Sequence, residues 1–232
     1  GGDGKKGRSV PPILQKARDR TAPMTRIGIY GGSFSPVHNG HLAAARAFME
    51  QMWLDVLYVI PARDPPHKQL DGQVRAAQRL RMCELAFAGT EGVIVSDMEL
   101  RRAGKSYTVD TLRELSAPDR RLFLLCGTDM LLTLDEWKSP EEIFRLSYPV
   151  YVRREDDRTL DAPILEKIDA YNREYGKVVR RIVMPPIPIS SAMVRGILAA
   201  GGDVSGLVPP PVAAYIAENR LYTGKKGEKD NE

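Results

Sequence analysis

A short segment near the start of the chain combines glycine, proline and histidine in an order suited to binding an anion. Between a predicted strand and a predicted helix it reads Gly31-Gly32-Ser33-Phe34-Ser35-Pro36-Val37-His38-Asn39-Gly40-His41. The paired glycines let the backbone approach a bulky anion, and the first turn of the helix offers free N–H groups. His38 and His41 are three residues apart, so both can donate hydrogen bonds to the same anion. The segment therefore predicts a phosphate-binding site.

Two other interpretations apply to these histidines. They could cap an ordinary glycine turn, or they could bind zinc, because histidines three positions apart can share a metal ion. A third protein ligand is not evident, and Cys83 and Cys126 lie far apart without CxxC or Cys/His spacing. We therefore favour a phosphate site, expect both cysteines to be buried thiols, and predict that the protein itself holds no metal.

Short apolar runs along the chain predict the strands that position this segment. They occupy residues 26–30, 55–60, 93–96, 122–126, 149–152 and 182–184. Segments with helical periodicity separate or follow them, at residues 42–52, 80–87, 109–115, 164–175, 192–200 and 212–219. This alternation predicts an α/β fold: a Rossmann-like, doubly wound parallel sheet with a small C-terminal helical region. Ligands in such folds bind at the carboxyl ends of the strands.

Charge and composition limit the classes of partner. The chain has 232 residues, 43% of them hydrophobic, and a net charge of +4. Residues 1–23 account for all of that charge, which leaves 28 basic and 28 acidic side chains in the rest. A nucleic-acid surface needs a local basic excess, so we expect no nucleic-acid partner. No apolar run approaches the roughly 18 residues of a membrane span, and we expect a cytoplasmic protein without a membrane partner.

The ends of the chain and one internal charge run are expected to lie outside the core. Residues 1–23 are rich in glycine, proline and charge and predict an extension, and residues 224–232 predict a solvated tail. Arg75, Arg79 and Arg81 form a charge run on a helix whose other face is apolar, so we expect them to face solvent. The sequence leaves the oligomeric state open, a homo-oligomer included.

The glycine–histidine segment closely resembles the GGxFxPxHxGH signature of the nucleotidyltransferase superfamily. In that superfamily the two HxGH histidines bind the phosphates of ATP and stabilise the transition state. The resemblance implies that Gly31, Gly32, Ser33, Phe34, His38 and His41 bind ATP. Ser35 stands where bacterial members often have Asp, and Ser33 where Thr is common. The histidines are intact, so these departures affect only local loop contacts.

Four further strings resemble nicotinate mononucleotide adenylyltransferases in particular. They are IPARDPPHK at 60–68, SYTVDTL at 106–112, CGTD at 126–129 followed by Trp137, and ISSAMVR at 189–195. The first implies that Lys68, the basic residue after PPH, helps to hold phosphate. The resemblance covers about residues 25–223 in the expected order, so residues 24–223 are expected to form one nucleotidyltransferase domain.

The residues of these strings also make physical sense by themselves. Thr108 opens a helix after Tyr107, where its hydroxyl and nearby N–H groups could accept a carboxylate; a plain helix cap is the alternative. Trp137 could stack on a pyridine ring, although a lone tryptophan is more often part of a core. Asp129 could accept a hydrogen bond from a ribose hydroxyl or cap the next helix. Together with Lys68 and Arg154, these four residues are our candidates for binding the mononucleotide.

Two arginines complete the candidate site. Ser190 and Ser191 precede a helix with Arg195 one turn on, a compact arrangement for the β- and γ-phosphates, unless it is a serine cap beside a surface arginine. The resemblance places Arg154 near the bound dinucleotide, with a surface salt bridge as the alternative. His38, His41 and Arg195 are therefore the expected catalytic residues.

The resemblance implies transfer of the adenylyl group of ATP to nicotinic acid mononucleotide, which yields nicotinic acid adenine dinucleotide and pyrophosphate in NAD biosynthesis. Mg²⁺ is expected to arrive with ATP, held mainly by phosphate oxygens and water. Two alternatives remain open. One is the same chemistry on nicotinamide mononucleotide or another phosphorylated acceptor, and the other is a nucleotide-binding module without catalysis.

Overall fold

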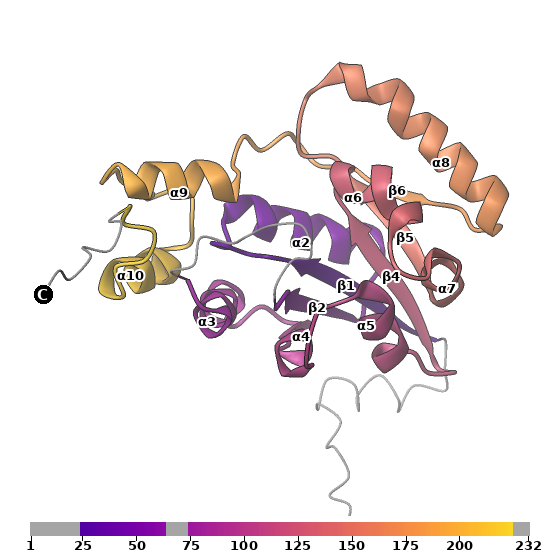
Figure 1. Ribbon diagram of the computed structural model, residues 1–232, viewed down its shortest axis with the longest axis horizontal. Helices are drawn as coiled ribbons and strands as arrows, with labels where there is room; N and C mark the ends of the chain where they lie inside the picture. The colour runs from indigo at the N-terminus through magenta and orange to yellow at the C-terminus, as the bar shows by residue number, and fades with distance from the viewer. Residues whose placement is uncertain (1–23, 64–73, 225–232) are drawn as a thin grey trace, which may run out of the picture.

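The computed structural model describes residues 24–63 and 74–224, which fold around one parallel sheet (Figure 1). The strands in these residues are β1 (Thr25–Gly32), β2 (Val56–Pro61), β3 (Val93–Val95), β4 (Arg120–Cys126), β5 (Ser147–Val152) and β6 (Arg180–Ile182). The helices are α2 (Asn39–Gln51), α3 (Ala76–Phe87), α4 (Met98–Arg101), α5 (Thr108–Leu115), α6 (Thr128–Thr133), α7 (Pro140–Leu146), α8 (Asp161–Tyr175), α9 (Ser191–Ala199) and α10 (Pro210–Glu218). The alternation confirms the predicted α/β class.

The direction of winding reverses between β1 and β4. The strands lie in the order β3-β2-β1-β4-β5-β6, and all pairs are parallel. In the register of the sheet, Ile29 of β1 pairs with Tyr58 of β2 on one side and with Leu124 of β4 on the other. In open α/β sheets, ligands bind beyond the carboxyl ends of the two strands at such a reversal. The glycine–histidine segment follows β1 at this point.

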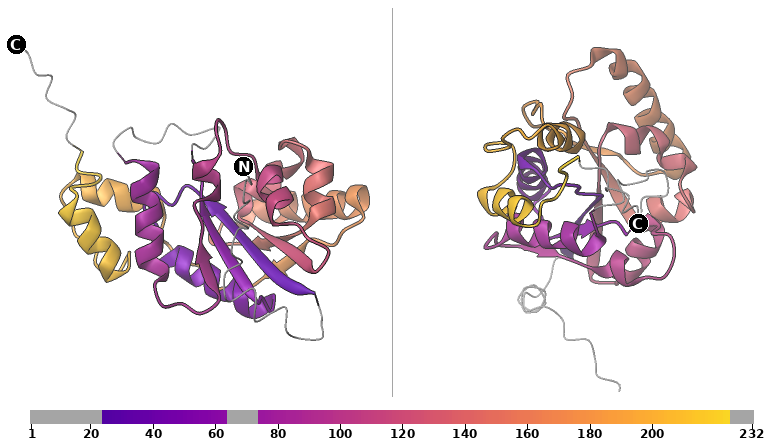
Figure 2. Two further views of the ribbon diagram at one scale, coloured as in Figure 1. Left: turned by 90° about the horizontal axis from the view of Figure 1, so that it is seen from below. Right: turned by 60° about the vertical axis from the view of Figure 1, so that its left-hand side comes forward.

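Helices cover both faces of the sheet, as a doubly wound fold requires. On one face α2, α3, α9 and α10 pack on a core that includes Phe123 and Val150. On the other face α4 to α8 pack on a core that includes Ile29 and Leu124. Figure 2 shows the yellow C-terminal helix α10 beside α3, and these two helices are in contact. The C-terminal helices therefore belong to the same core as the sheet, which confirms the predicted helical region.

The prediction for the charge run on α3 is wrong for one residue. Arg75 and Arg81 are exposed, but only 1% of the surface of Arg79 is exposed. Arg79 lies three and four residues before Met82 and Cys83, which are fully buried, so it falls on the inner face of the helix. The sequence prediction groups Arg79 with Arg75 and Arg81 because all three are arginines, although their positions on the helix differ.

Some short elements carry no sequence signal. Helices α4, α6 and α7 have four, six and seven residues, which is too few turns for a periodic pattern to emerge.

Both cysteines are free and buried, as predicted. In the part of the chain that the structure describes, no helix is long and apolar enough to cross a membrane.

Candidate active site

The two histidines meet at the start of α2. Nδ1 of His38 accepts a hydrogen bond from the backbone N–H of Gly40 at 3.0 Å, and the backbone N–H of His38 donates to Nδ1 of His41 at 3.1 Å. The two ring centroids are 3.8 Å apart. A Cβ atom on residue 40 would stand 2.8 Å from the ring of His38, so glycine is required between the histidines. The spacing of the HxGH string thus brings the two imidazoles into contact, with their planes tilted by 32°.

Both imidazoles are neutral at neutral pH. Burial, followed by the charge of Arg154, lowers the pKa of His38 to about 4. Burial also holds the pKa of His41 well below its ordinary value, with smaller contributions from His38 and Arg154. Because each Nδ1 accepts a hydrogen bond, the hydrogen-bond pattern assigns the single proton of each ring to Nε2. Each histidine therefore offers one N–H donor, which is what a phosphate oxygen accepts.

The residues before His38 shape the entrance to the pair. β1 ends at Gly31 and Gly32, where the backbone reaches the surface. Phe34 is buried and has a φ of 46°, in the left-handed region, and its ring meets the ring of His41 edge-on at 4.9 Å. The carbonyl oxygen of Ser33 accepts a hydrogen bond from the buried Arg79 at 2.6 Å. The loop is therefore packed against the histidines.

Side chains from the C-terminal part of the chain hold this loop. Nη1 of Arg195 donates to the carbonyl oxygen of Ser35 at 2.8 Å, and Oγ of Ser191 donates to that of Pro36 at 2.9 Å. The hydroxyls of Ser35 and Tyr222 share a buried hydrogen bond of 2.8 Å. The fold thus brings Ser191 and Arg195, which the sequence places more than 150 residues away, to the histidine loop.

Neighbouring arginines at the end of β5 have different surroundings. Arg153 forms an ion pair with Asp161 and donates to backbone carbonyls of its own loop. The charge of Arg154 instead helps to lower the pKa of His38 and of His41, so its guanidinium is within electrostatic range of both rings. Nη1 of Arg154 is buried and has no hydrogen-bond partner among the described residues. A buried N–H group without a partner is costly, and an anion between Arg154 and the histidines would satisfy it.

Ser190 caps its helix, whereas Thr108 and Asp129 do not occupy N-cap positions. Ser190 does cap α9, because its Oγ accepts a hydrogen bond from a backbone N–H three residues on. Thr108 is the first residue of α5, whose N-cap is Tyr107, and no side-chain bond from Tyr107 caps the helix. Asp129 is the exposed second residue of α6, whose N-cap is Gly127. Helices α5 and α6 thus begin without the side-chain caps that the sequence allowed.

Tyr107, the N-cap of α5, lies next to the turn that precedes α7. Nζ of Lys138 is 4.2 Å from the centroid of the Tyr107 ring. The preceding residue, Trp137, is partly buried and donates from Nε1 to Oγ1 of Thr133 at 3.2 Å. The Tyr107–Thr108 and Trp137 segments therefore share one region. Lys68 lies outside the described residues.

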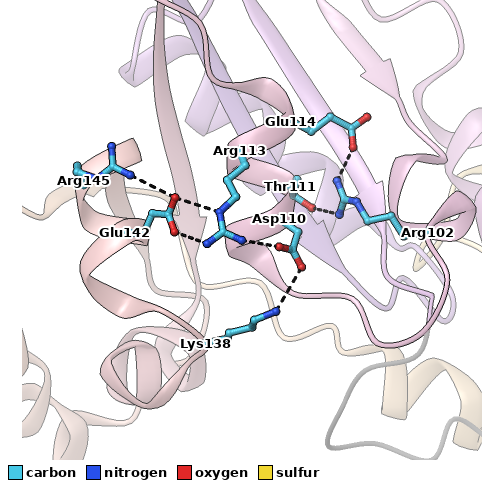
Figure 3. A network of polar contacts seen from close by, with 8 residues as sticks. All are labelled: Arg102, Asp110, Thr111, Arg113, Glu114, Lys138, Glu142 and Arg145. Atoms are coloured by element: carbon cyan, nitrogen blue, oxygen red, sulfur yellow. Dashed lines mark hydrogen bonds and ion pairs between the residues drawn. The ribbon is translucent and has the colours of Figure 1, made fainter.

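A network of charged side chains fixes α5 against α7 (Figure 3). Arg113 donates to Asp110 on its own helix at 2.9 Å and forms an ion pair with Glu142 on α7. Arg145 joins the network at Glu142, 3.2 Å away, and Lys138 lies 3.9 Å from Asp110. The network sets the start of α5 relative to the turn that carries Trp137. No sequence motif indicates this network, because its members come from separate segments of the chain.

A second set of contacts connects α5 to α4 and to Arg102, which follows α4. Thr111 donates to Oε1 of Glu99 at 2.9 Å, and Nη1 of Arg102 donates to Oγ1 of the same threonine at 2.8 Å. Arg102 also pairs with Glu114 at 2.7 Å. Glu99 is buried, and burial raises its pKa. Sequence reasoning missed these residues, as it missed Tyr222 and Arg79.

The chain is similar to known proteins over most of its length. A family model described as cytidylyltransferase-like matches residues 29–197. A probable nicotinate-nucleotide adenylyltransferase of Chromobacterium violaceum is 39% identical over 208 residues, which cover 85% of this chain and 98% of that protein. A protein of the same name from Geobacter metallireducens is 38% identical, with 85% of this chain and 98% of that protein covered.

Solved structures show the same fold. The nicotinic acid mononucleotide adenylyltransferase of Plasmodium falciparum, complexed with NaAD, has a TM-score of 0.65 and 21% identity, covering 85% of this chain and 97% of that one. A structure of the same protein complexed with APC also has a TM-score of 0.65. From the matched family model and from relatives covered over nearly their whole length, this chain belongs to the nicotinate-nucleotide adenylyltransferase family of cytidylyltransferase-like proteins.

Proposed function

We propose that this protein transfers the adenylyl group of ATP to nicotinic acid mononucleotide, giving nicotinic acid adenine dinucleotide and pyrophosphate in NAD biosynthesis. The observation that carries the proposal is the group of two neutral histidines and Arg154 beside the strand reversal. The names of the sequence relatives support the choice of substrates. A related structure that holds NaAD supports the product.

The reaction needs positioning and charge stabilisation more than proton transfer. An oxygen of the mononucleotide phosphate forms a bond to the α-phosphorus of ATP, and the bond from that phosphorus to the bridging oxygen breaks. The electron pair leaves with pyrophosphate. The nucleophile is already an anion at neutral pH, so no general base is required. The protein must hold two anions in line and stabilise the charge on the phosphoryl oxygens.

His38 and His41 suit that task as neutral donors. We assign their two Nε2–H groups and the free Nη1 of Arg154 to the oxygens of the α-phosphate. Donors fixed in place by other hydrogen bonds stabilise developing charge without reorganisation. The backbone at Gly31 to Phe34 would lie against the rest of the triphosphate.

The closing segment is assigned to the leaving pyrophosphate. Arg195 uses one N–H on the carbonyl of Ser35, and a guanidinium has five such groups, so others are available to phosphate oxygens. Ser190 and Ser191 stand at the start of α9, where backbone N–H groups favour an anion. A helix start and a guanidinium together suit a polyanionic leaving group such as pyrophosphate.

The acceptor would occupy the region between α5 and the turn before α7. We assign the nicotinate carboxylate to Thr108 and the backbone after Tyr107, and the pyridine ring to Trp137. Asp129, exposed in the first turn of α6, is assigned to a ribose hydroxyl. Lys68 remains a proposed phosphate contact. An anionic carboxylate fits the uncapped first turn of α5 better than a neutral amide does.

Mg²⁺ is proposed as a partner of ATP. Among the described residues, no three His, Cys, Asp or Glu side chains gather closely enough to hold a metal ion. The donors that this site does offer, imidazole N–H and guanidinium, bind phosphate and not a cation. The ion would therefore be held by phosphate oxygens and water, and when bound it would neutralise part of the triphosphate charge.

The direct test is to identify the products. Purified protein with Mg-ATP and nicotinic acid mononucleotide should form nicotinic acid adenine dinucleotide and pyrophosphate in equal amounts, measured by chromatography with mass detection. A protein with both His38 and His41 changed to alanine should form neither above background. Absence of both products with the parent protein, at any tested acceptor concentration, would refute the proposal.

A further inference from the structure

Arg79 on α3 has no assigned part in the site, although it is the largest fully buried side chain of the described residues. We propose that Arg79 is a positioning residue for adenylyl transfer, whose guanidinium fixes the histidine loop relative to the end of β2. The kinetic part of this inference rests on the proposed function.

The guanidinium of Arg79 joins the carboxyl ends of two neighbouring strands. Nη1 donates to the carbonyl oxygen of Ser33, just after β1, at 2.6 Å. Nη2 donates to the carbonyl oxygens of Ala62 and Arg63, just after β2, at 2.6 Å and 2.9 Å. One side chain thus binds three backbone carbonyls in two loops that both lie on the ligand side of the sheet.

Packing alone does not explain an arginine at this position. Its neighbours on the inner face of α3 are Met82 and Cys83, and an apolar side chain would continue that face. Burying a guanidinium is unfavourable unless hydrogen bonds replace the lost water. The planar fork can reach two loops at once, whereas the single ammonium of lysine cannot bind the same three carbonyls in the same geometry. The residue type therefore matches the need to join the loops.

The contact at Ser33 leads directly to the histidines. Ser33 is followed by Phe34, whose ring lies edge-on to His41 at 4.9 Å. Two residues after Ser33, Arg195 binds the carbonyl of Ser35. Two guanidinium groups thus hold the loop at alternate residues. Arg195 is assigned to phosphate, but the burial of Arg79 keeps it away from substrate, so its effect must pass through the loop.

The test compares replacements at two positions of one helix. Arg79→Met keeps most of the side-chain volume and removes the donors, and Arg79→Lys keeps the charge without the fork. Arg81→Met is the matched control, because Arg81 is 54% exposed and its side chain pairs only with Glu84 among the described residues. Each protein is examined for its thermal unfolding, for kcat and KM, and for the NMR signals of its histidine rings.

Both Arg79 variants are expected to lose at least about tenfold in kcat/KM, mainly through kcat, because small displacements of reacting groups have effects of this size or larger. The ring signals of His38 and His41, assigned by single replacements, should move in the folded Arg79 variants. Arg81→Met should keep both its signals and its kcat/KM within about twofold of the parent, as surface substitutions usually do.

Three results would overturn the inference. The first is a folded Arg79→Met protein with parental histidine signals. The second is kcat/KM within twofold of the parent for both Arg79 variants, and the third is an equal loss in Arg81→Met. If both Arg79 variants fail to fold, Arg79→Ala is assayed with millimolar guanidinium chloride against equal sodium chloride. Recovery of activity with guanidinium alone supports the inference, and no recovery counts against it.

Failure of the proposed function would be visible separately. If the parent protein forms no dinucleotide, the proposed reaction is wrong, but the histidine spectra still report whether Arg79 positions the loop. If the parent is active but the Arg79 variants keep the parental histidine signals and kcat/KM, only the positioning role of Arg79 is refuted.

Discussion

Nδ1 of His41 lies 3.1 Å from the backbone nitrogen of His38, so the ring that closes the first turn of α2 also has its tautomer fixed by that turn. The bond occupies one ring nitrogen and leaves the proton on the other. The structural contact and the donor proposed for phosphate therefore belong to different nitrogens of one side chain. Replacements that keep one nitrogen or the other can separate the two roles.

His41→Asn should retain the fold and lose activity. The asparagine oxygen can take the place of Nδ1 and accept from His38, but no group replaces Nε2. We expect kcat to fall by about 10² to 10³, the effect of removing one preorganised donor. His41→Gln, whose amide nitrogen reaches the place of Nε2, should retain more activity. Equal kcat for His41→Asn and the parent would show that Nε2 has no part in the reaction.

The stability of the free protein should decrease in mild acid because of His38. Its pKa is about 4 in the folded state, against about 6.5 in an unfolded chain. The unfolded state therefore binds more protons between these values, so the free energy of unfolding falls as pH is lowered from about 6.5 to about 4, by about 3 kcal/mol. Urea unfolding at several pH values measures this. A His38→Asn protein should show a shallower decrease, and identical slopes would contradict the assignment.

Arg154→Met and Arg153→Met should behave differently despite their adjacent positions. Loss of Arg154 removes a positive charge beside the histidines, so kcat/KM should fall by about a hundredfold and the pKa of His38 should rise. Arg153 pairs with Asp161 and is not among the charges that shift the pKa of either histidine, so its loss should leave the kinetics nearly unchanged. Histidine NMR titration and steady-state kinetics report on both. Equal effects of the two replacements would refute the distinction.

Tyr222→Phe should weaken the attachment of the histidine loop. The hydroxyl that it loses is buried in a 2.8 Å bond with Ser35, and an unpaired Ser35 hydroxyl costs about 1 to 3 kcal/mol. The urea midpoint should decrease accordingly. Tyr215→Phe, a half-buried control on α10, should show little change. In a double-mutant cycle with Ser35→Ala the effects should not add, and strict additivity would show that the bond contributes nothing.

The fold and the anion-binding loop could be predicted because their signals are local. A strand, two glycines and a helix start adjoin one another in sequence, so their chemistry is visible as a string. Alternation of strands and helices likewise gave the doubly wound sheet, because each element shows its own periodicity. The contact of Arg195 with Ser35 spans 160 residues, and only the family pattern suggested that the two regions meet.

What could not be predicted depends on contacts between elements. Arg79 has the same residue type as exposed Arg75 and Arg81, and only the three-dimensional contact with two loops distinguishes it. The ion pair of Arg113 with Glu142 joins two helices without a shared motif. A single sequence contains no record of such pairings.

The most direct test of the central claim is a comparison of kcat/KM for pyrophosphate release from Mg-ATP with nicotinic acid mononucleotide and with nicotinamide mononucleotide as acceptor. We predict pyrophosphate release with nicotinic acid mononucleotide and a much higher kcat/KM for this acid than for nicotinamide mononucleotide. Equal rates would keep the reaction and contradict the carboxylate site at Thr108. No release with either acceptor would contradict adenylyl transfer to a pyridine mononucleotide.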